Sequence, residues 1–190
     1  MIRLLISDFD GTLVDTFEAN FRAYSDAFAS CGLHLEKALY REYFGLRFDR
    51  FMDAMDINDQ NIRREIRRIK GERYPYYFDY LKVNTPLLKL LRCFKALGGQ
   101  IAIASTAREK NLLNALSHIG AVSDFDLILA GENVSKGKPD PEIYLSVLEK
   151  LGVSASEAIV FEDSEVGMQA AQAAGIGCIN VNVSCSIPKQ

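Results

Sequence analysis

Two carboxylates stand two residues apart near the start of the chain, at Asp8 and Asp10, directly after the apolar run of residues 2–6. The run is short and aliphatic, which is typical of a buried strand, and Gly11 lets the backbone turn sharply where that strand ends. In open α/β sheets, ligands bind beyond the carboxyl ends of the strands. Two acids held this close raise each other's pKa, which indicates a metal site or a proton-transfer role. An acidic turn that caps the next helix is the alternative interpretation.

Other polar groups follow later strand-like runs. Ser105 and Thr106 offer hydroxyl groups after residues 100–104, where a helix is also expected to begin. This arrangement suits phosphate binding, although a plain helix cap is the commoner use of such residues. Lys138 lies in a loop that two prolines stiffen, and such a lysine is either directed into a site or simply solvated.

A second acidic pair, Glu162 and Asp163, follows the run of residues 158–161. With Asp8 and Asp10 it would place as many as four carboxylates in one crevice, against the single positive charge of Lys138. That balance requires a cation, and oxygen ligands with open positions favour Mg²⁺. A phosphate dianion would then be held by the metal, Lys138 and the Ser105 hydroxyl while Asp8 attacks phosphorus.

Strand-like and helix-like stretches alternate through the second half of the chain. Thr85 is expected to cap one helix, with Pro86 in its first position, and Asp140 another, with Pro141 in its first turn. The expected strands are residues 2–6, 100–104, 126–130, 158–161 and 178–181. Such alternation predicts an α/β fold, a Rossmann-like, doubly wound parallel sheet of five strands with helices on both faces.

Residues 16–83 interrupt this pattern with helical periodicity and no convincing strand. We therefore expect a helical cap domain at 16–83, inserted into an α/β core domain formed by 1–15 and 84–190. A run of four arginines at residues 63–68 is most simply a solvated face, and an anion-collecting role is the alternative. The aromatic cluster at 74–80 favours core packing over a pocket lining.

Composition excludes several classes of function. The 190 residues carry a net charge of −3, which gives no general reason to expect nucleic acid or an anionic membrane as partner. No stretch is long and apolar enough to span a membrane, and no signal peptide is recognisable, so the cytoplasm is the expected location. The four cysteines are scattered, without the spacing of a zinc site or a disulfide framework. We expect a monomer or weak homodimer.

The motifs together resemble the haloacid dehalogenase superfamily of hydrolases, in the subgroup with a helical cap that contains phosphoglycolate phosphatase and β-phosphoglucomutase. Four motifs match in order, and the match spans nearly the whole chain: DFDGT at residues 8–12, Ser105 after an apolar run, Lys138 in KPDP, and Glu162 with Asp163 in FEDS. Any one motif is weak evidence, but four at strand exits are specific. The resemblance implies a HAD-like fold and a phosphatase of small phosphorylated metabolites.

The resemblance also implies roles. Asp8 would be the nucleophile that forms an aspartyl phosphate, and Asp10 would protonate the leaving oxygen and then deprotonate water. Ser105 and Lys138 would bind the transferring phosphoryl group. The remaining assignments concern metal and substrate: Asp8, the Asp10 backbone carbonyl, Asp163 and Glu162 as Mg²⁺ ligands, and Thr106, Arg108 and Arg47 as substrate contacts, with a solvated surface residue as the alternative for either arginine.

Within the superfamily the sequence disfavours some activities. Dehalogenases lack an acid at the place of Asp10, and phosphonate-cleaving relatives need a cap lysine that the loop at residues 44–48 does not contain. β-Phosphoglucomutase carries a histidine where this chain has Asn20, so a phosphosugar mutase is the second interpretation. A response-regulator receiver and a phosphate-binding protein without catalysis are the alternatives from other classes. The intact acids and Lys138 disfavour the latter.

Overall fold

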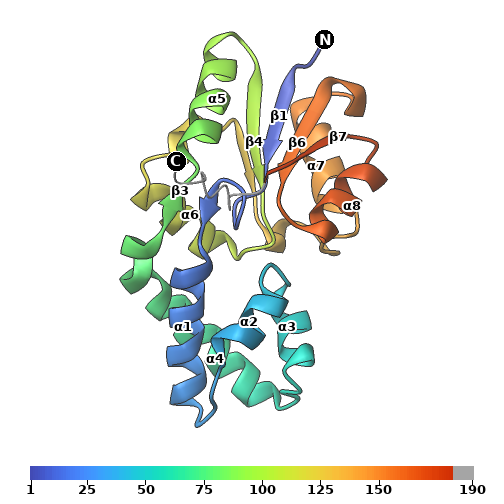
Figure 1. Cartoon of the computed structure of the whole chain (residues 1–190). Helices are drawn as coiled ribbons and strands as arrows, with labels where there is room; N and C mark the ends of the chain where they lie inside the picture. Colours follow the sequence, from blue (N-terminus) through green and yellow to red (C-terminus); the bar gives the residue numbers. More distant parts are fainter. Residues whose placement is uncertain (182–190) are drawn as a thin grey trace, which may run out of the picture.

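The computed structural model of the chain describes residues 1–181, and its centre is one parallel sheet of five strands in the order β5-β4-β1-β6-β7 (Figure 1). The strands are β1 (Leu4–Ser7), β4 (Gln100–Ala104), β5 (Leu127–Leu129), β6 (Ala158–Glu162) and β7 (Gly177–Asn180). β1 lies in the middle, paired in parallel with β4 and with β6. Because all strands run the same way, their carboxyl ends meet at one edge. The expected five-stranded parallel sheet is confirmed.

Alternate residues of the strands face two separate apolar clusters. Leu5, Ile101 and Ile103 point to the face covered by α5 (Thr85–Ala96) and α6 (Glu109–His118). Their neighbours Leu4 and Ile6 point to the opposite face, under α7 (Glu142–Leu151) and α8 (Glu165–Ala173). This follows from the two-residue period of a strand. Helices on both faces make the sheet doubly wound, as expected.

The insertion consists of α1 (Phe17–Ser30), α2 (Lys37–Tyr43), α3 (Phe48–Ala54), α4 (Gln60–Arg73) and the 3₁₀ helix η1 (Tyr74–Tyr80). Figure 1 shows α1 to α4 as a lobe facing the carboxyl ends of the strands, and we call this insertion the cap. Much of the cap has its own aromatic cluster, centred on Phe28, Phe51 and Tyr40. The division into domains at 16–83 stays a prediction.

Two short strands cross between cap and core. β2 (Val14–Asp15) pairs in antiparallel fashion with β3 (Lys82–Val83), so the two crossing segments lie side by side. The expectation of no strand in 16–83 is therefore wrong at Lys82 and Val83, because two residues are too short to show an alternating pattern. Three further 3₁₀ turns complete the described elements: η2 (Val122–Asp124), η3 (Gly131–Asn133) and η4 (Ala155–Glu157).

The ends of two helices differ in detail from the expectation. Asn84, not Thr85, caps α5, since its side chain accepts from the Leu87 amide at 3.2 Å. The N-cap position of α7 is Pro141, and Asp140 lies one residue earlier, where it accepts from the Glu142 amide at 3.1 Å. Among residues 1–181, no helix has the length and apolar character to cross a bilayer.

Three of the four arginines in the run of α4 are paired with acids, and the fourth, Arg64, donates to the Asn61 side chain at 2.8 Å. Arg63 meets Asp53, Arg67 meets Asp49, and Arg68 meets Glu65 and Glu72; the side chains of Arg67 and Arg68 are exposed, whereas that of Arg63 is largely buried. The partners take up the charge that would attract an anion, so the solvated-face interpretation describes this helix better than an anion-collecting one.

Candidate active site

Asp8 follows β1 directly and lies at the centre of the sheet's carboxyl edge. Its amide donates to the Phe161 carbonyl at 2.9 Å, which fixes the exit of β1 against β6. Its carboxylate accepts from Lys138 Nζ at 2.7 Å. Lys138 also donates to Glu162 Oε1 at 2.6 Å and to the Ala104 carbonyl at 3.0 Å, and its side chain is 2% exposed. The structure thus brings together groups that are more than 100 residues apart.

The electrostatics of this cluster are those of a buried ion pair with an excess of acid. Burial raises the pKa of Asp8, Glu162 and Asp10 raise it further, and Lys138 opposes them. Burial alone would lower the pKa of Lys138, but Asp8 and Glu162 hold that pKa well above its usual value, so the ammonium stays charged. One lysine faces several carboxylates, and the site therefore favours the addition of a cation.

Glu162 is completely buried and its carboxylate is fully engaged. Oε1 accepts from Lys138 and from the Tyr144 hydroxyl at 3.0 Å, and Oε2 accepts from the Ser164 amide at 3.1 Å and hydroxyl at 3.0 Å. Burial would raise the pKa of Glu162, but Lys138 and the Ser164 groups hold it below the usual value. In this structure Glu162 acts as the anchor that aims Lys138 at Asp8.

Asp163 lies on the open side of the same turn. Its Oδ1 accepts from the Thr12 hydroxyl at 2.7 Å, and a Cβ at Gly11 would overlap its carboxylate, so glycine permits the approach. Burial raises the pKa of Asp163 to about 6. Carboxylate oxygens of Asp8, Glu162 and Asp163 lie within 4.8 Å of one another, an arrangement that can hold a metal ion. The side chain of Asp10 is not in this group.

The Asp10 carboxylate turns instead toward the cap. Oδ1 accepts from the Thr16 hydroxyl at 2.5 Å and from the Asn20 amide at 3.3 Å, both at the start of α1. Oδ2 accepts from the Ser105 hydroxyl at 3.4 Å, and Ser105 Oγ in turn accepts from the Ala107 amide. The site therefore holds two carboxylates in different surroundings, one on a lysine and one on hydroxyl and amide donors.

A pocket of about 100 Å³ lies between cap and core, with Asp10 on its wall. We call it the inner pocket. Lys70 of α4 reaches it from the cap, with its Nζ 4.1 Å from the Tyr74 ring centroid. Burial lowers the pKa of Lys70 to about 8, and the charge of Asp10 partly opposes this. No carboxylate in residues 1–181 forms an ion pair with Lys70, so its ammonium group is available to a bound molecule.

Of the three residues expected to contact substrate, two line this pocket and one does not. Thr106 lines it, and its hydroxyl lies 3.5 Å from the Gly45 carbonyl of the cap. Arg108 also lines it, but half of its side chain is exposed and it pairs with Glu132 at 3.2 Å. Arg47 does not line it: its guanidinium donates to the carbonyls of core residues.

Lys70 and Tyr144 belong to the site but were not predicted from the sequence. Lys70 stands four residues after Ile66, on the apolar face of an amphipathic helix, and a lysine on that face was a usable signal. Tyr144 occupies an apolar position of α7, where its hydroxyl gives no indication of a partner. The contact between Asn20 and Asp10 was not predicted either.

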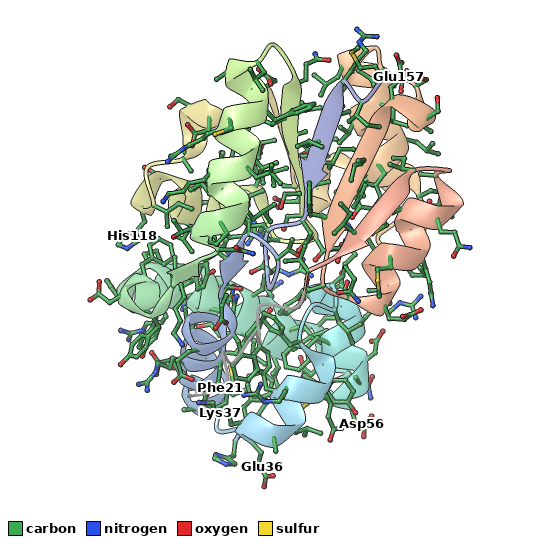
Figure 2. All side chains as sticks on the ribbon, turned by 45° about the horizontal axis from the view of Figure 1, so that its top comes forward. Phe21, Glu36, Lys37, Asp56, His118 and Glu157 are labelled. Atoms are coloured by element: carbon green, nitrogen blue, oxygen red, sulfur yellow. The ribbon has the colours of Figure 1, made fainter. Side chains whose placement is uncertain are left out.

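Ser105 does not lie at a helix start, because α6 begins only at Glu109, so the helix-capping alternative for Ser105 is wrong. The two histidines, His34 and His118, are both exposed. Figure 2 shows His118 at the edge of the molecule, where it packs against the Phe78 ring at 5.2 Å.

Residues 5–181 match the family model of the haloacid dehalogenase-like hydrolases, and the chain therefore belongs to this family. It is similar to a phosphorylated carbohydrates phosphatase of Thermotoga maritima, with 34% identity over 176 residues that cover 90% of this chain and 81% of that protein. It also resembles the crystal structure of CbbY from Rhodobacter sphaeroides in complex with phosphate, with a TM-score of 0.87, 29% identity and coverage of 100% and 90%.

A second structure of CbbY, a mutant in complex with xylulose-(1,5)bisphosphate, gives a TM-score of 0.86 and 29% identity, covering 95% of this chain and 86% of that one. These findings confirm the resemblance and the fold class that the sequence predicts. They also confirm the class of enzyme, a phosphatase of the haloacid dehalogenase-like family.

Proposed function

We propose that this chain is a magnesium-dependent phosphatase that hydrolyses small phosphorylated carbohydrates through an aspartyl phosphate on Asp8. The observation that carries the proposal is the separation of Asp8 from Asp10. Asp8 is held by the Lys138 ammonium at 2.7 Å, whereas Asp10 is held by Thr16, Asn20 and Ser105 on the wall of the inner pocket. One carboxylate is thus placed for attack on phosphorus and the other for proton transfer.

The donor set fits magnesium. Carboxylate oxygens of Asp8, Glu162 and Asp163, a ligand type that Mg²⁺ prefers, converge within 4.8 Å. Gly11 leaves room for Asp163 to enter this set, since a Cβ there would overlap the carboxylate. We assign Asp8 and Asp163 as ligands, with the Asp10 backbone carbonyl beside them and Glu162 as their buried support. Magnesium, when bound, would offset the negative charge of the carboxylates and the phosphoryl oxygens.

The residues of the chain divide the remaining work. Ser105 and Lys138 hold the phosphoryl oxygens, because the Lys138 ammonium contacts Asp8 and the Ser105 hydroxyl contacts Asp10. A carboxylate oxygen of Asp8 forms a bond to phosphorus as the bond to the leaving oxygen breaks. Asp10 gives its proton to that oxygen, and then takes a proton from the water that attacks the aspartyl phosphate, which restores Asp8.

The inner pocket supports a small, hydroxylated leaving group. Its aromatic walls suit the faces of a sugar, and Asn20 and Lys70 offer hydrogen-bond donors. Two relatives agree with this choice: one is named for phosphorylated carbohydrates and another is bound to a sugar bisphosphate. The cytoplasmic location and the monomer or weak dimer stay predictions.

The test is phosphate release from a panel of sugar phosphates, measured for the purified chain with magnesium, with a chelator, and with two variants. Asp8→Asn is expected to lower kcat at least about a thousandfold. Asp163→Asn should raise the magnesium concentration needed for half-maximal activity. The control is Asp56→Asn, because Asp56 lies on the cap far from the acids (Figure 2) and its φ of 53° suits asparagine.

Each alternative gives its own result. A mutase would convert one sugar phosphate into its isomer with little phosphate released, and product analysis by NMR would show this. A binding protein without catalysis would release no phosphate, and no phosphoryl group would be transferred to its Asp8. Activity that survives both the chelator and Asp8→Asn would contradict the proposal.

A further inference from the structure

The cap is fastened to the core by Arg47. This residue holds the N-cap position of α3, yet its side chain does not cap that helix. One guanidinium nitrogen donates to the Gly131 carbonyl at 2.6 Å and another to the Ser135 carbonyl at 3.4 Å. Both acceptors belong to the core loop of residues 131–138, which ends at Lys138. Arg47 of the cap thus donates its hydrogen bonds to backbone carbonyls of the loop that carries Lys138.

Gly137 shows that this contact is close-packed. A Cβ at Gly137 would overlap the aliphatic part of Arg47. The backbone of Gly137 is not in the left-handed region, so its conformation alone does not require glycine. The missing side chain instead makes room for the arginine one residue before Lys138.

Hydrogen bonds to Glu142 fix the part of the loop that Arg47 contacts. The Glu142 carboxylate accepts from the Ser135 amide at 2.8 Å, the Ser135 hydroxyl at 2.7 Å and the Lys136 amide at 2.7 Å. These bonds tie the loop to the first turn of α7. They leave the carbonyl of Ser135 directed to Arg47.

The segment beside Arg47 also forms a wall. Gly45, Leu46 and Thr106 line the inner pocket on one side, and on the other they line an open groove between cap and core, which we call the outer groove. Arg47 and Lys138 line only the outer groove. Apart from the two bonds of Arg47, the hydrogen bond that joins segment 44–48 to the core within residues 1–181 is the long one from the Thr106 hydroxyl to the Gly45 carbonyl, at 3.5 Å.

We propose that Arg47 is a positioning residue that latches the cap onto the loop of residues 131–138: the latch holds the wall formed by Gly45 and Leu46 against the core during phosphoryl transfer, and it steadies the loop that carries Lys138. This rests on the proposed function, and it gives Arg47 a role other than the expected contact with substrate. A closed cap excludes water from the reacting groups, and its release lets product leave. The guanidinium suits the role because its two terminal nitrogens, held apart in one rigid plane, donate to two different carbonyls, whereas an ammonium offers all its donors from a single nitrogen.

The first test compares Arg47→Ala and Arg47→Lys with the control Arg50→Ala. Arg50 lies one turn further along α3, is exposed and lines the same outer groove. We expect Arg47→Ala to lower kcat about tenfold, the size of effect that follows from losing one charge-assisted hydrogen bond. Arg47→Lys should retain an intermediate rate, and Arg50→Ala the full rate. The loss should be the same for substrates with one phosphate and with two.

The second test needs no activity. Backbone hydrogen exchange is measured by mass spectrometry for segments 44–48 and 131–138 in the absence of substrate. Arg47→Ala should speed exchange in both segments and Arg50→Ala in neither. Because this readout does not depend on catalysis, it separates failure of the latch from failure of the proposed phosphatase.

A third variant, Gly137→Ala, tests the close packing of Gly137 against Arg47. Gly137→Ala should displace Arg47, so the double variant Arg47→Ala with Gly137→Ala should lose no more activity than Gly137→Ala alone. The proposal is overturned if exchange is unchanged in Arg47→Ala. It is equally overturned if the loss falls on KM alone and only for bisphosphates, because Arg47 would then be a substrate ligand.

Discussion

Asp8 and Asp10 are two residues apart in sequence, yet each meets its own set of partners. Asp8 contacts the one buried ammonium of the sheet edge, and Asp10 contacts hydroxyl and amide groups that come partly from the cap. Asp8 directly follows β1, whereas Asp10 begins the turn that its bridge to Val14 closes, so the two side chains do not share the register of one strand. This local turn makes it possible for neighbouring acids of one type to perform different steps.

Replacing the acid at Asp10 should separate these two steps. Asp10→Asn retains the hydrogen bonds of Thr16 and Ser105 in part but has no proton to give, so hydrolysis of sugar phosphates should fall roughly a hundred- to ten-thousandfold. An aryl phosphate has a leaving group that needs no proton, so its first step should suffer less and phosphorylated protein should accumulate. Intact mass measurement after mixing checks this. Equal losses for both substrates without accumulation would contradict the assignment of Asp10.

Lys70 should be costly for stability and useful for function. Its pKa, lowered by burial from 10.5 to about 8, means that keeping it charged in the fold at neutral pH costs about 3 kcal/mol. Between pH 8 and 10.5 the unfolded chain binds the proton that the folded chain has lost, so this cost disappears as pH rises. Lys70→Met should therefore stabilise the protein most below pH 8, and the gain should shrink by about 3 kcal/mol by pH 10.5.

Urea unfolding of Lys70→Met and wild type across this pH range measures the difference directly. The exposed Lys89 of α5 supplies the matched control, since Lys89→Met should show no such pH dependence. The same Lys70→Met chain should hydrolyse its best sugar phosphate more slowly. A stability difference that stays constant with pH would show that Lys70 is not held charged against burial.

At the scale of elements, the turn from β6 to α8 organises the acid cluster. Ser164 caps α8 by accepting from the Gly167 amide at 3.1 Å and, at the same time, donates to Glu162. A Cβ at Gly167 would overlap the Glu162 carboxylate. The first turn of the helix, the buried glutamate and Lys138 beyond it are therefore one packed unit.

Gly167→Ala tests this unit. Alanine favours a helix by about 1 kcal/mol over glycine, but here overpacking should cost roughly 1–3 kcal/mol and displace Glu162, so stability and kcat should both fall. The control is Gly71→Ala in α4, where a Cβ would meet only Asn111 at 3.9 Å. That variant should gain stability. Thermal unfolding and phosphate release measure both effects, and an active, stabilised Gly167→Ala would show that Glu162 tolerates movement.

The same elements show which parts of the site can be predicted from the sequence. The acids and Lys138 follow apolar runs, and because parallel strands end at one edge, their meeting could be predicted. The partners of Arg47 and Lys70 could not be predicted, since these contacts depend on how the cap packs against the core. Nothing in the spacing of residues 45–48 shows that the guanidinium lies on Gly131 and Ser135. The α5 cap and β3 were missed because they involve one or two residues.

At the scale of the molecule, cap and core share apolar packing. The cluster on one face of the sheet joins Phe9 and Leu13 of the core with Ala23 of α1 and with Tyr74 and Phe78 of η1. The more distant part of the cap has a separate cluster around Phe51. The near half of the cap thus packs into the core cluster, and we expect cap and core to unfold as one cooperative unit.

Phe51→Ala tests this cooperativity. Phe51 is buried in the distant cluster, in contact with the rings of Tyr24 and Tyr40, and its loss should cost about 3–5 kcal/mol. Seven of the eight tyrosines lie in residues 24–80, so near-ultraviolet circular dichroism reports on the cap and far-ultraviolet circular dichroism on all helices and strands. If the variant unfolds as one unit, both signals should change at the same, lowered unfolding midpoint, and the calorimetric and van't Hoff enthalpies should be equal. Loss of the tyrosine signal ahead of the rest would instead show a cap that unfolds by itself, and the packing of η1 on the sheet would then be too weak to couple the two parts.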